Sequence, residues 1–201
     1  MRKLDEDYRR NLPHIQPDEG LFAITYRIKG SLPKSVVDFY DDEYEKAIIL
    51  SINEISARDL FFEITDAYLD KGLSHDILID SKIAKIVIDS LKYYDGKYYT
   101  LIAYCIMSNH VHLIIDKSNL EFASLSAIFG SIKGYSAGLI NKLIGRTGHF
   151  WASEIYDHLI KNEKELDSQI KYVINNPVKA GLVDKWQQWD YSFVDDEYID
   201  Y

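Results

Sequence analysis

Two neighbouring apolar segments in the middle of the chain have the pattern of a pair of β-strands. Residues 97–107 and 110–116 are rich in the β-branched and aromatic residues that favour strands. The pair Asp95-Gly96 just before them is a turn signal. Hydrophobic and polar positions also alternate over residues 21–28, and residues 149–160 are predicted to form a further strand.

Other segments repeat their hydrophobic residues at helical intervals. Asn162 and Glu165 match a capping box at the start of one of them. That helix is expected to end near Asn176, because the residue before a proline is pushed away from helical angles. Helices are predicted over residues 34–55, 80–94, 125–145 and 162–176, and the ambiguous residues 57–79 are interpreted as a helix followed by a loop.

The elements follow the order β-α-α-β-β-α-β-α, which fits an α+β fold with an antiparallel sheet and helices packed mainly on one face. The sequence has no internal repeat, low-complexity tract or linker rich in Pro, Gly and Ser. We therefore expect a single domain over residues 1–201, with an N-terminal extension over about 1–19 and an acidic C-terminal extension over about 194–201.

The formal net charge of −9 argues against nucleic-acid binding, since phosphate contacts need Lys and Arg. The distribution of charge weakens that objection. Nine acids lie within residues 38–45 and 195–200, and without them the acids equal the 23 bases. Residues 122–152 contain no acid but include Lys133, Lys142 and Arg146. A locally basic surface or a solvated helix face explains these three bases about equally well.

The lone Cys105 cannot form an internal disulfide, which favours a reduced, cytoplasmic environment. No apolar run approaches the roughly 20 residues that span a membrane, and the first residues lack the hydrophobic core of an export signal. We expect no contact with a membrane.

Two histidines share one face of the strand predicted over 110–116. Side chains two residues apart in a strand point the same way, so His110 and His112 lie together while Val111 points to the other face. Two interpretations stay open. The histidines could be core residues satisfied by hydrogen bonds, or a shared divalent metal could satisfy both through neutral imidazole nitrogens.

Tyr172 and Asn176 are four residues apart on a predicted helix and project from the same face. A tyrosine on an amphipathic helix usually packs in the core, and the Asn176-Pro177 step is explained as a helix stop. Periodicity and composition do not assign chemistry to this pair.

Three segments in order, "CIMSNHVHLII", "GHFWASEIYDHLIKNEKEL" and "KYVINNPVKAGLV", resemble the Y1 single-strand transposases of the IS200 type, and most closely the REP-associated tyrosine transposases of bacteria. The likeness extends to "LFAITYRIKGSLPK" and covers about residues 20–193. It implies a ferredoxin-like fold whose central strand carries the two histidines of the HUH motif, His110 and His112, with the Tyr172 helix packed across it. Tyr172 matches the nucleophile, and Asn176 matches the third ligand of a Mg²⁺ or Mn²⁺ ion. Two positions depart from the wider family, which has glutamine at Asn176 in the insertion-sequence branch and usually proline at Ser108.

The resemblance implies metal-dependent cleavage and rejoining of single-stranded DNA at REP-like hairpins through a 5′-phosphotyrosine intermediate, in the course of DNA transposition. It also implies a bacterial protein of the cytoplasm that associates with the nucleoid. Insertion-sequence relatives are dimers that exchange the tyrosine helix, so both a monomer and a homodimer stay open here. Two other functions also stay open, a non-cutting hairpin-binding protein (a domesticated relative or repressor) and a metal-dependent hydrolase that uses water.

Candidate DNA contacts are Lys133, Lys142, Arg146, Trp151 and Lys179. Stacking on an unpaired base is one role for Trp151 or Phe150, and core packing is the favoured alternative. His158 is interpreted as a structural residue or as a neighbour that orients a metal ligand, with DNA contact as the alternative.

Overall fold

The computed structural model describes residues 17, 19–36, 62, 65–69, 76–118, 120–121 and 123–199. Most of the helix predicted over 34–55 and almost all of the N-terminal extension lie outside these residues, and so does much of the segment 57–79.

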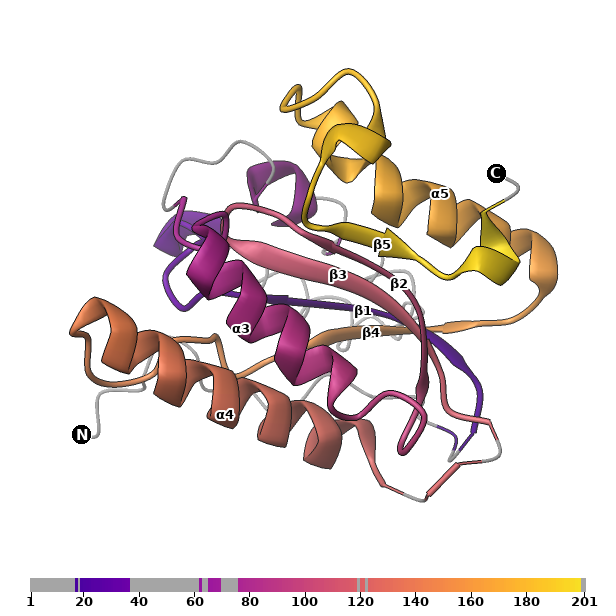
Figure 1. Cartoon of the computed structure of the whole chain (residues 1–201), viewed down its shortest axis with the longest axis horizontal. Coiled ribbons are helices and arrows are strands. Elements are labelled where there is room, and N and C mark those ends of the chain that lie inside the picture. The colour runs from indigo at the N-terminus through magenta and orange to yellow at the C-terminus, as the bar shows by residue number, and fades with distance from the viewer. Residues whose placement is uncertain are drawn as a thin grey trace, which may run out of the picture.

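A five-stranded antiparallel sheet forms the centre of the described structure, in the order β4-β1-β3-β2-β5 (Figure 1). The strand that carries the two histidines, β3, is therefore central, as expected. The strands are β1 (Leu21–Arg27), β2 (Thr100–Ile106), β3 (His110–Asp116), β4 (Tyr156–Ile160) and β5 (Ser192–Val194).

The register of the sheet fixes the neighbours of the two histidines. On β1, Thr25 lies opposite His112 and Arg27 lies opposite His110. On β2, Cys105 lies opposite His112. A tight connection joins β2 to β3. Its ends are held by a hydrogen bond of 2.9 Å from the backbone N–H of Met107 to the carbonyl of His110.

Long helices cover both faces of the sheet. α3 (Ser81–Lys92) and α4 (Leu125–Ile144) lie on one face, and α5 (Glu163–Lys179) crosses the other against β2 and β3 (Figure 1). Each helix begins at a side chain that accepts a backbone hydrogen bond, which satisfies an otherwise free N–H. These residues are Asp80, Ser124 and Asn162. α4 ends at Gly145, whose φ of 66° is accessible to glycine at little cost.

Two hydrophobic cores follow from the alternation of side chains along the strands. Val111, Leu113 and Ile115 face α3 and α4 and belong to the larger core. On the opposite side of β3, Ile114 packs in a second core with Ile170 and other residues of α5. His110 and His112 are in phase with Ile114, so both imidazoles lie on the side of the sheet that α5 covers.

Two boundaries differ from the sequence prediction. β4 begins at Tyr156 and not at residue 149, because the apolar residues before it pack into the core with only an isolated bridge between Ile28 and Trp151. α5 continues to Lys179, with Pro177 in its last turn. Asn176 and Pro177 are both buried there, so tertiary packing outweighs the local preference of a residue before proline.

The strand β5 was not predicted. It has three residues and pairs with the edge of β2, too short a segment to show a period. Beyond it, the backbone N–H of Asp195 donates to the carbonyl of Ile102 at 2.8 Å. A short helical turn, η2 (Asp196–Tyr198), follows, and another, η1 (Trp186–Gln188), precedes β5. The described part of the acidic C-terminal segment is therefore attached to the sheet. None of the helices in the described part of the chain is long and apolar enough to cross a membrane.

Candidate active site

The two histidines of β3 meet at their Nε2 atoms. His110 is 0% exposed and His112 is 1% exposed. Their Nε2 atoms are 2.8 Å apart, and the ring planes are nearly perpendicular at 89°. The sequence predicted a shared face. The structure adds that both rings turn the same nitrogen toward one point.

The outer nitrogen of each ring is held by a neighbour. Asn109 donates its amide N–H to the carbonyl of Leu69 at 3.2 Å, which directs its oxygen toward His110. His110 Nδ1 therefore donates to Asn109 Oδ1, at 2.7 Å, and its Nε2 carries the lone pair. Thr25 Oγ1 lies 2.7 Å from His112 Nδ1. A hydroxyl can accept or donate, so Thr25 is compatible with either tautomer of His112.

The electrostatic surroundings keep His110 neutral. Burial is the main cause that lowers the pKa of His110 well below its ordinary value of 6.5, and His112 and Lys179 lower it further. Asp66 acts in the opposite direction but does not reverse the shift. A neutral imidazole with a bare Nε2 is the form that binds metal ions.

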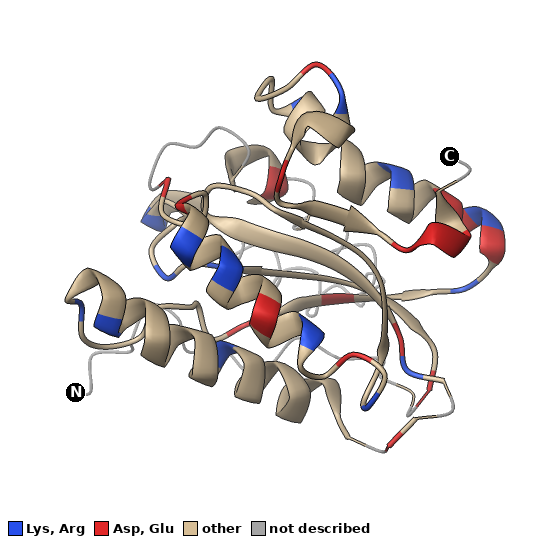
Figure 2. Cartoon of the chain, in the orientation of Figure 1, with Lys and Arg blue, Asp and Glu red and all other residues tan. Residues whose placement is uncertain are grey.

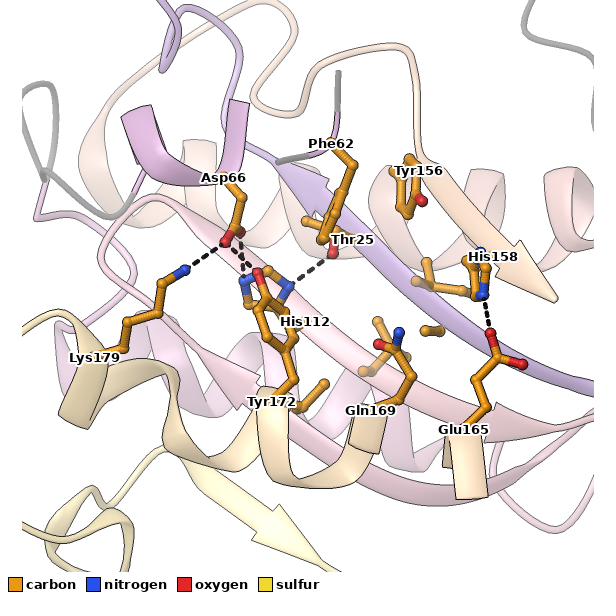
Figure 3. A pocket seen from close by; sticks show the side chains of 14 residues that line it. Thr25, Phe62, Asp66, His112, Tyr156, His158, Glu165, Gln169, Tyr172 and Lys179 are labelled. Atoms are coloured by element: carbon orange, nitrogen blue, oxygen red, sulfur yellow. Dashed lines mark hydrogen bonds and ion pairs between the residues drawn. The ribbon is translucent and has the colours of Figure 1, made fainter. Parts of the chain in front are cut away.

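A buried carboxylate completes the group. Asp66 belongs to a helical segment at residues 65–69 and is 2% exposed. Its Oδ1 lies 3.3 Å from His112 Nε2, and its Oδ2 accepts hydrogen bonds from the Tyr172 hydroxyl and from Lys179 Nζ, the latter at 3.1 Å (Figure 3). Burial alone would raise the pKa of Asp66, but its interactions with His112, His110 and Tyr172 bring the pKa below the usual range. The carboxylate is therefore ionised at neutral pH.

Tyr172 reaches this group from α5. Its ring centroid is 5.8 Å from that of His112, and Lys179 Nζ lies 5.3 Å from the centre of the tyrosine ring. The tyrosine and the histidines of one chain thus meet without a second subunit. This proximity was expected from the resemblance and not from periodicity.

Asn176 lies one helical turn beyond Tyr172 and is fully buried, at 0% exposure. Its amide N–H donates to the carbonyl of Tyr172 at 3.1 Å. Its Oδ1 is buried and has no hydrogen-bond partner within the part of the chain that the structure describes. A buried carbonyl oxygen without a partner is unfavourable by about 1–3 kcal/mol, which a cation would offset.

The side chains fit a divalent metal ion. Asp66, His110 and His112 each offer one ligand atom, and these atoms lie within 4.8 Å of one another. Imidazole nitrogen and carboxylate oxygen suit Mn²⁺ and related first-row ions. Sequence reasoning missed Asp66, because residues 57–79 carry no motif and their secondary structure was ambiguous.

A cavity of about 420 Å³ opens between α5 and the strands β1 and β4. Asp66, Tyr172 and Lys179 line one part of it, and His158 and Glu165 line another (Figure 3). His158 Nε2 is 2.8 Å from Glu165 Oε1, so the predicted neighbour of the site is paired with a carboxylate inside the same cavity. Phe62 and Tyr156 stack there with ring centroids 4.1 Å apart and planes inclined by 20°.

The candidate DNA contacts fall into separate places. Lys179 lines the cavity, whereas the bases of α4 lie on the other side of the sheet. Figure 2 shows basic but no acidic charge on α4. Lys133 donates to the carbonyl of Ser153 at 2.7 Å, and the Arg146 guanidinium lies 5.6 Å from the ring centre of Phe150. Lys142 is in the last turn of α4.

Trp151 is a core residue, which was the favoured alternative. It is 4% exposed and packs between Tyr26 and Phe150. Its indole N–H donates to Ser136 Oγ at 2.9 Å. The ring has no exposed face on which a base could stack. Phe150 is fully buried in the same core.

An antiparallel sheet whose central strand carries paired imidazoles, with a tyrosine facing them from a helix, defines the class of HUH tyrosine transposases. Residues 75–176 match the sequence model of the family described as "Transposase IS200 like", about half of the chain. The chain belongs to this family. The matched segment contains His110, His112, Tyr172 and Asn176, whereas Thr25 and Asp66 precede it.

Two individual proteins are similar to the chain. A REP-associated tyrosine transposase of Haemophilus influenzae is 29% identical over 99 residues, which cover 45% of this chain and 56% of the relative. The matched part thus spans little more than half the length of that relative. A solved structure of a REP-associated tyrosine transposase bound to a REP hairpin has a TM-score of 0.54 and 16% identity, covering 92% of this chain and 80% of the other. The likeness shows a shared fold.

Proposed function

We propose that this protein cleaves and rejoins single-stranded DNA at hairpin-bearing, REP-like sequences through a covalent 5′-phosphotyrosine link to Tyr172, as a step in DNA transposition. The activity would take place in the bacterial cytoplasm, on the DNA of the nucleoid. The observation that carries the proposal is the position of the Tyr172 hydroxyl beside the buried pair His110 and His112. Nothing in the proposal requires a second subunit, although a homodimer is compatible with it.

The proposed reaction is a transesterification. The Tyr172 oxygen forms a bond to phosphorus, and the bond from phosphorus to the 3′-oxygen breaks. The phenolic proton is released, and the departing oxygen takes up a proton to become a free 3′-hydroxyl. The new phosphodiester keeps the bond energy, so a 3′-hydroxyl can attack it to rejoin DNA without ATP.

The chain's own groups prepare this step. Asp66 accepts the hydrogen bond of the Tyr172 hydroxyl and holds the oxygen in the cavity. Lys179, half-exposed beside the hydroxyl, is suited to contact the backbone phosphate. On the far side of the sheet, Lys133, Lys142 and Arg146 are proposed contacts for the hairpin.

His110 and His112 would hold the metal ion through Nε2, and Asn176 would offer its buried Oδ1, which has no partner among the described residues. A bound Mg²⁺ or Mn²⁺ ion would polarise the scissile phosphate and offset the charge that develops on the leaving oxygen. The preference for these two ions comes from the resemblance to the family, since imidazole alone also suits Zn²⁺.

A denaturing gel tests the proposal. Wild-type protein is incubated with Mn²⁺ and a single-stranded oligonucleotide that carries a REP-type hairpin. We expect a protein band shifted by covalently linked DNA, and no such band for Tyr172→Phe. Cleavage that persists in Tyr172→Phe would indicate a hydrolase that uses water. Hairpin binding by the wild type without cleavage would indicate a non-cutting binding protein.

A further inference from the structure

One buried group is not accounted for by the family resemblance. Asp66 comes from the stretch between β1 and α3, ahead of the segment that matches the family. Its side chain is nevertheless among the most deeply buried polar groups of the site. A buried ionised carboxylate is strongly unfavourable unless cations or hydrogen-bond donors surround it.

The two oxygens of Asp66 have different environments. Oδ2 accepts hydrogen bonds from Tyr172 and Lys179. Oδ1 is buried, has no hydrogen-bond partner among the residues that the structure describes, and lies 3.3 Å from His112 Nε2. Half of the carboxylate is thus satisfied by the tyrosine and the lysine, and the other half is directed at the paired imidazoles.

The histidines cannot satisfy Oδ1 fully. Because His110 donates from Nδ1 to Asn109, its Nε2 is an acceptor, and a neutral His112 has a single proton to share. If that proton is on Nε2, it is directed at His110, which is 2.8 Å away. If it is on Nδ1, where Thr25 can accept it, the lone pairs of the two Nε2 atoms and of Asp66 Oδ1 point toward one another. A divalent cation stabilises that second arrangement.

We propose that Asp66 is a metal ligand through Oδ1, next to His110 and His112, while its Oδ2 fixes the Tyr172 hydroxyl beside the same ion. The inference rests on the proposed function for the ion and the nucleophile. A carboxylate oxygen adds a hard, negatively charged donor to two imidazoles, which favours Mn²⁺ and Mg²⁺ over softer ions. One side chain would then join the ion to the nucleophile and make the distance between them independent of DNA.

Metal binding without DNA tests this inference. The full chain is titrated with Mn²⁺ by calorimetry, and the free ion is followed by electron paramagnetic resonance. We expect Asp66→Asn, which keeps the shape and loses the charge, to weaken Mn²⁺ binding by about tenfold or more. Glu165→Gln is the matched control, because it removes a carboxylate from another part of the same cavity, and its affinity should equal that of the wild type. Equal affinities of Asp66→Asn and the wild type would overturn the proposal.

A second measurement does not depend on a variant. Crystals of the wild-type protein are soaked in Mn²⁺, and the ion is located by anomalous scattering. An ion within coordination distance of Asp66 Oδ1 and both Nε2 atoms supports the proposal. An ion held by the histidines with Asp66 turned away refutes it, whatever the stability of Asp66→Asn.

The outcome is separable from that of the DNA experiment. If the wild type forms the Tyr172 adduct but Asp66→Asn binds Mn²⁺ normally, the proposed function stands and the role of Asp66 fails. If Asp66→Asn loses Mn²⁺ but no adduct forms with wild-type protein, the metal ligand stands and the proposed function fails. If the wild-type protein binds no Mn²⁺, both the proposed metal ion and the proposed role of Asp66 fail.

Discussion

Thr25 on β1 lies directly opposite His112 on β3, and its hydroxyl is 2.7 Å from the outer nitrogen of that imidazole. A neighbour in this position fixes the orientation of a metal-binding imidazole, and a hydroxyl that accepts from Nδ1–H leaves Nε2 available to the ion.

Thr25→Val should therefore impair the site while leaving the strand intact, because valine has the same branched shape without the hydroxyl. We expect Mn²⁺ affinity and the rate of adduct formation to fall by about 10- to 100-fold. Thr25→Ser restores a hydroxyl and should recover most of both. A Thr25→Val variant with wild-type Mn²⁺ affinity would show that the hydroxyl does not prepare His112 for metal binding.

The bond between Tyr172 and Asp66 should contribute to stability as well as to chemistry. Tyr172→Phe removes a donor from a buried carboxylate, which we expect to lower the free energy of unfolding by about 1.5–3 kcal/mol. The loss should be smaller in an Asp66→Asn background. Urea denaturation of the two single variants and the double variant gives the coupling energy. Additive effects would mean that the two side chains do not interact in solution.

The basic residues at the C-terminal end of α4, Lys142 in its last turn and Arg146 just beyond it, should support hairpin binding through phosphate contacts. Lys142→Glu combined with Arg146→Glu should weaken binding of the hairpin oligonucleotide. The slope of log affinity against log salt should become shallower by about one for each phosphate that the double variant no longer neutralises. The charge-matched control is Lys82→Glu with Lys92→Glu on the neighbouring α3, where we expect a smaller effect. Equal losses of affinity would point to net charge and away from a specific role of α4.

Trp151 should matter for stability and not for DNA. Ser136→Ala leaves the buried indole N–H without its acceptor, and we expect it to lower the free energy of unfolding by about 1–3 kcal/mol. Trp151→Phe should also destabilise the fold, because it removes part of a packed ring. Hairpin affinity, measured well below the melting temperature, should be unchanged in both. A selective loss of affinity in Trp151→Phe would restore a stacking role.

The hydrogen-bonded pair of Glu165 and His158 should affect stability in acid. Partial burial would raise the pKa of Glu165, but the hydrogen bonds from His158 and from the backbone of Lys161 lower it below its ordinary value of 4.5. A carboxyl group whose pKa is lower in the folded than in the unfolded state stabilises the fold at pH values above its unfolded pKa. This stabilisation is lost as the pH falls through the pKa of the folded state. Between about pH 6 and about pH 3.5, the urea midpoint should therefore fall more in the wild type than in Glu165→Gln. Glu163→Gln, at an exposed position of the same helix, should behave as the wild type.

The sequence predicted the fold well wherever the hydrophobic residues of an element repeat with a clear period. α3 and the pair β2 and β3 match their predicted ranges closely, because apolar spacing and turn signals agree there. The shared face of His110 and His112 followed from strand geometry alone. The late start of β4 did not, since the apolar residues before it pack in the core without forming a strand.

Only part of the candidate site could be predicted from the sequence. Tyr172 and Asn176 were assigned by resemblance, because a tyrosine on an amphipathic helix looks like any core residue. Asp66 carried no signal at all. Its role depends on the folding of a distant segment onto β3, 106 positions from Tyr172 and in a stretch without clear periodicity.

The positions that form the site are spread along nearly the whole described chain: Thr25, Asp66, the two histidines and Tyr172. Because of this spread, the site can form only after most of the chain has been synthesised and folded. During synthesis on the ribosome the histidine strand emerges well before the helix that carries Tyr172, so the proposed DNA-cleaving site would not yet be assembled. The proposed activity would therefore require the assembled fold, and local unfolding that detaches one contributing segment would remove it.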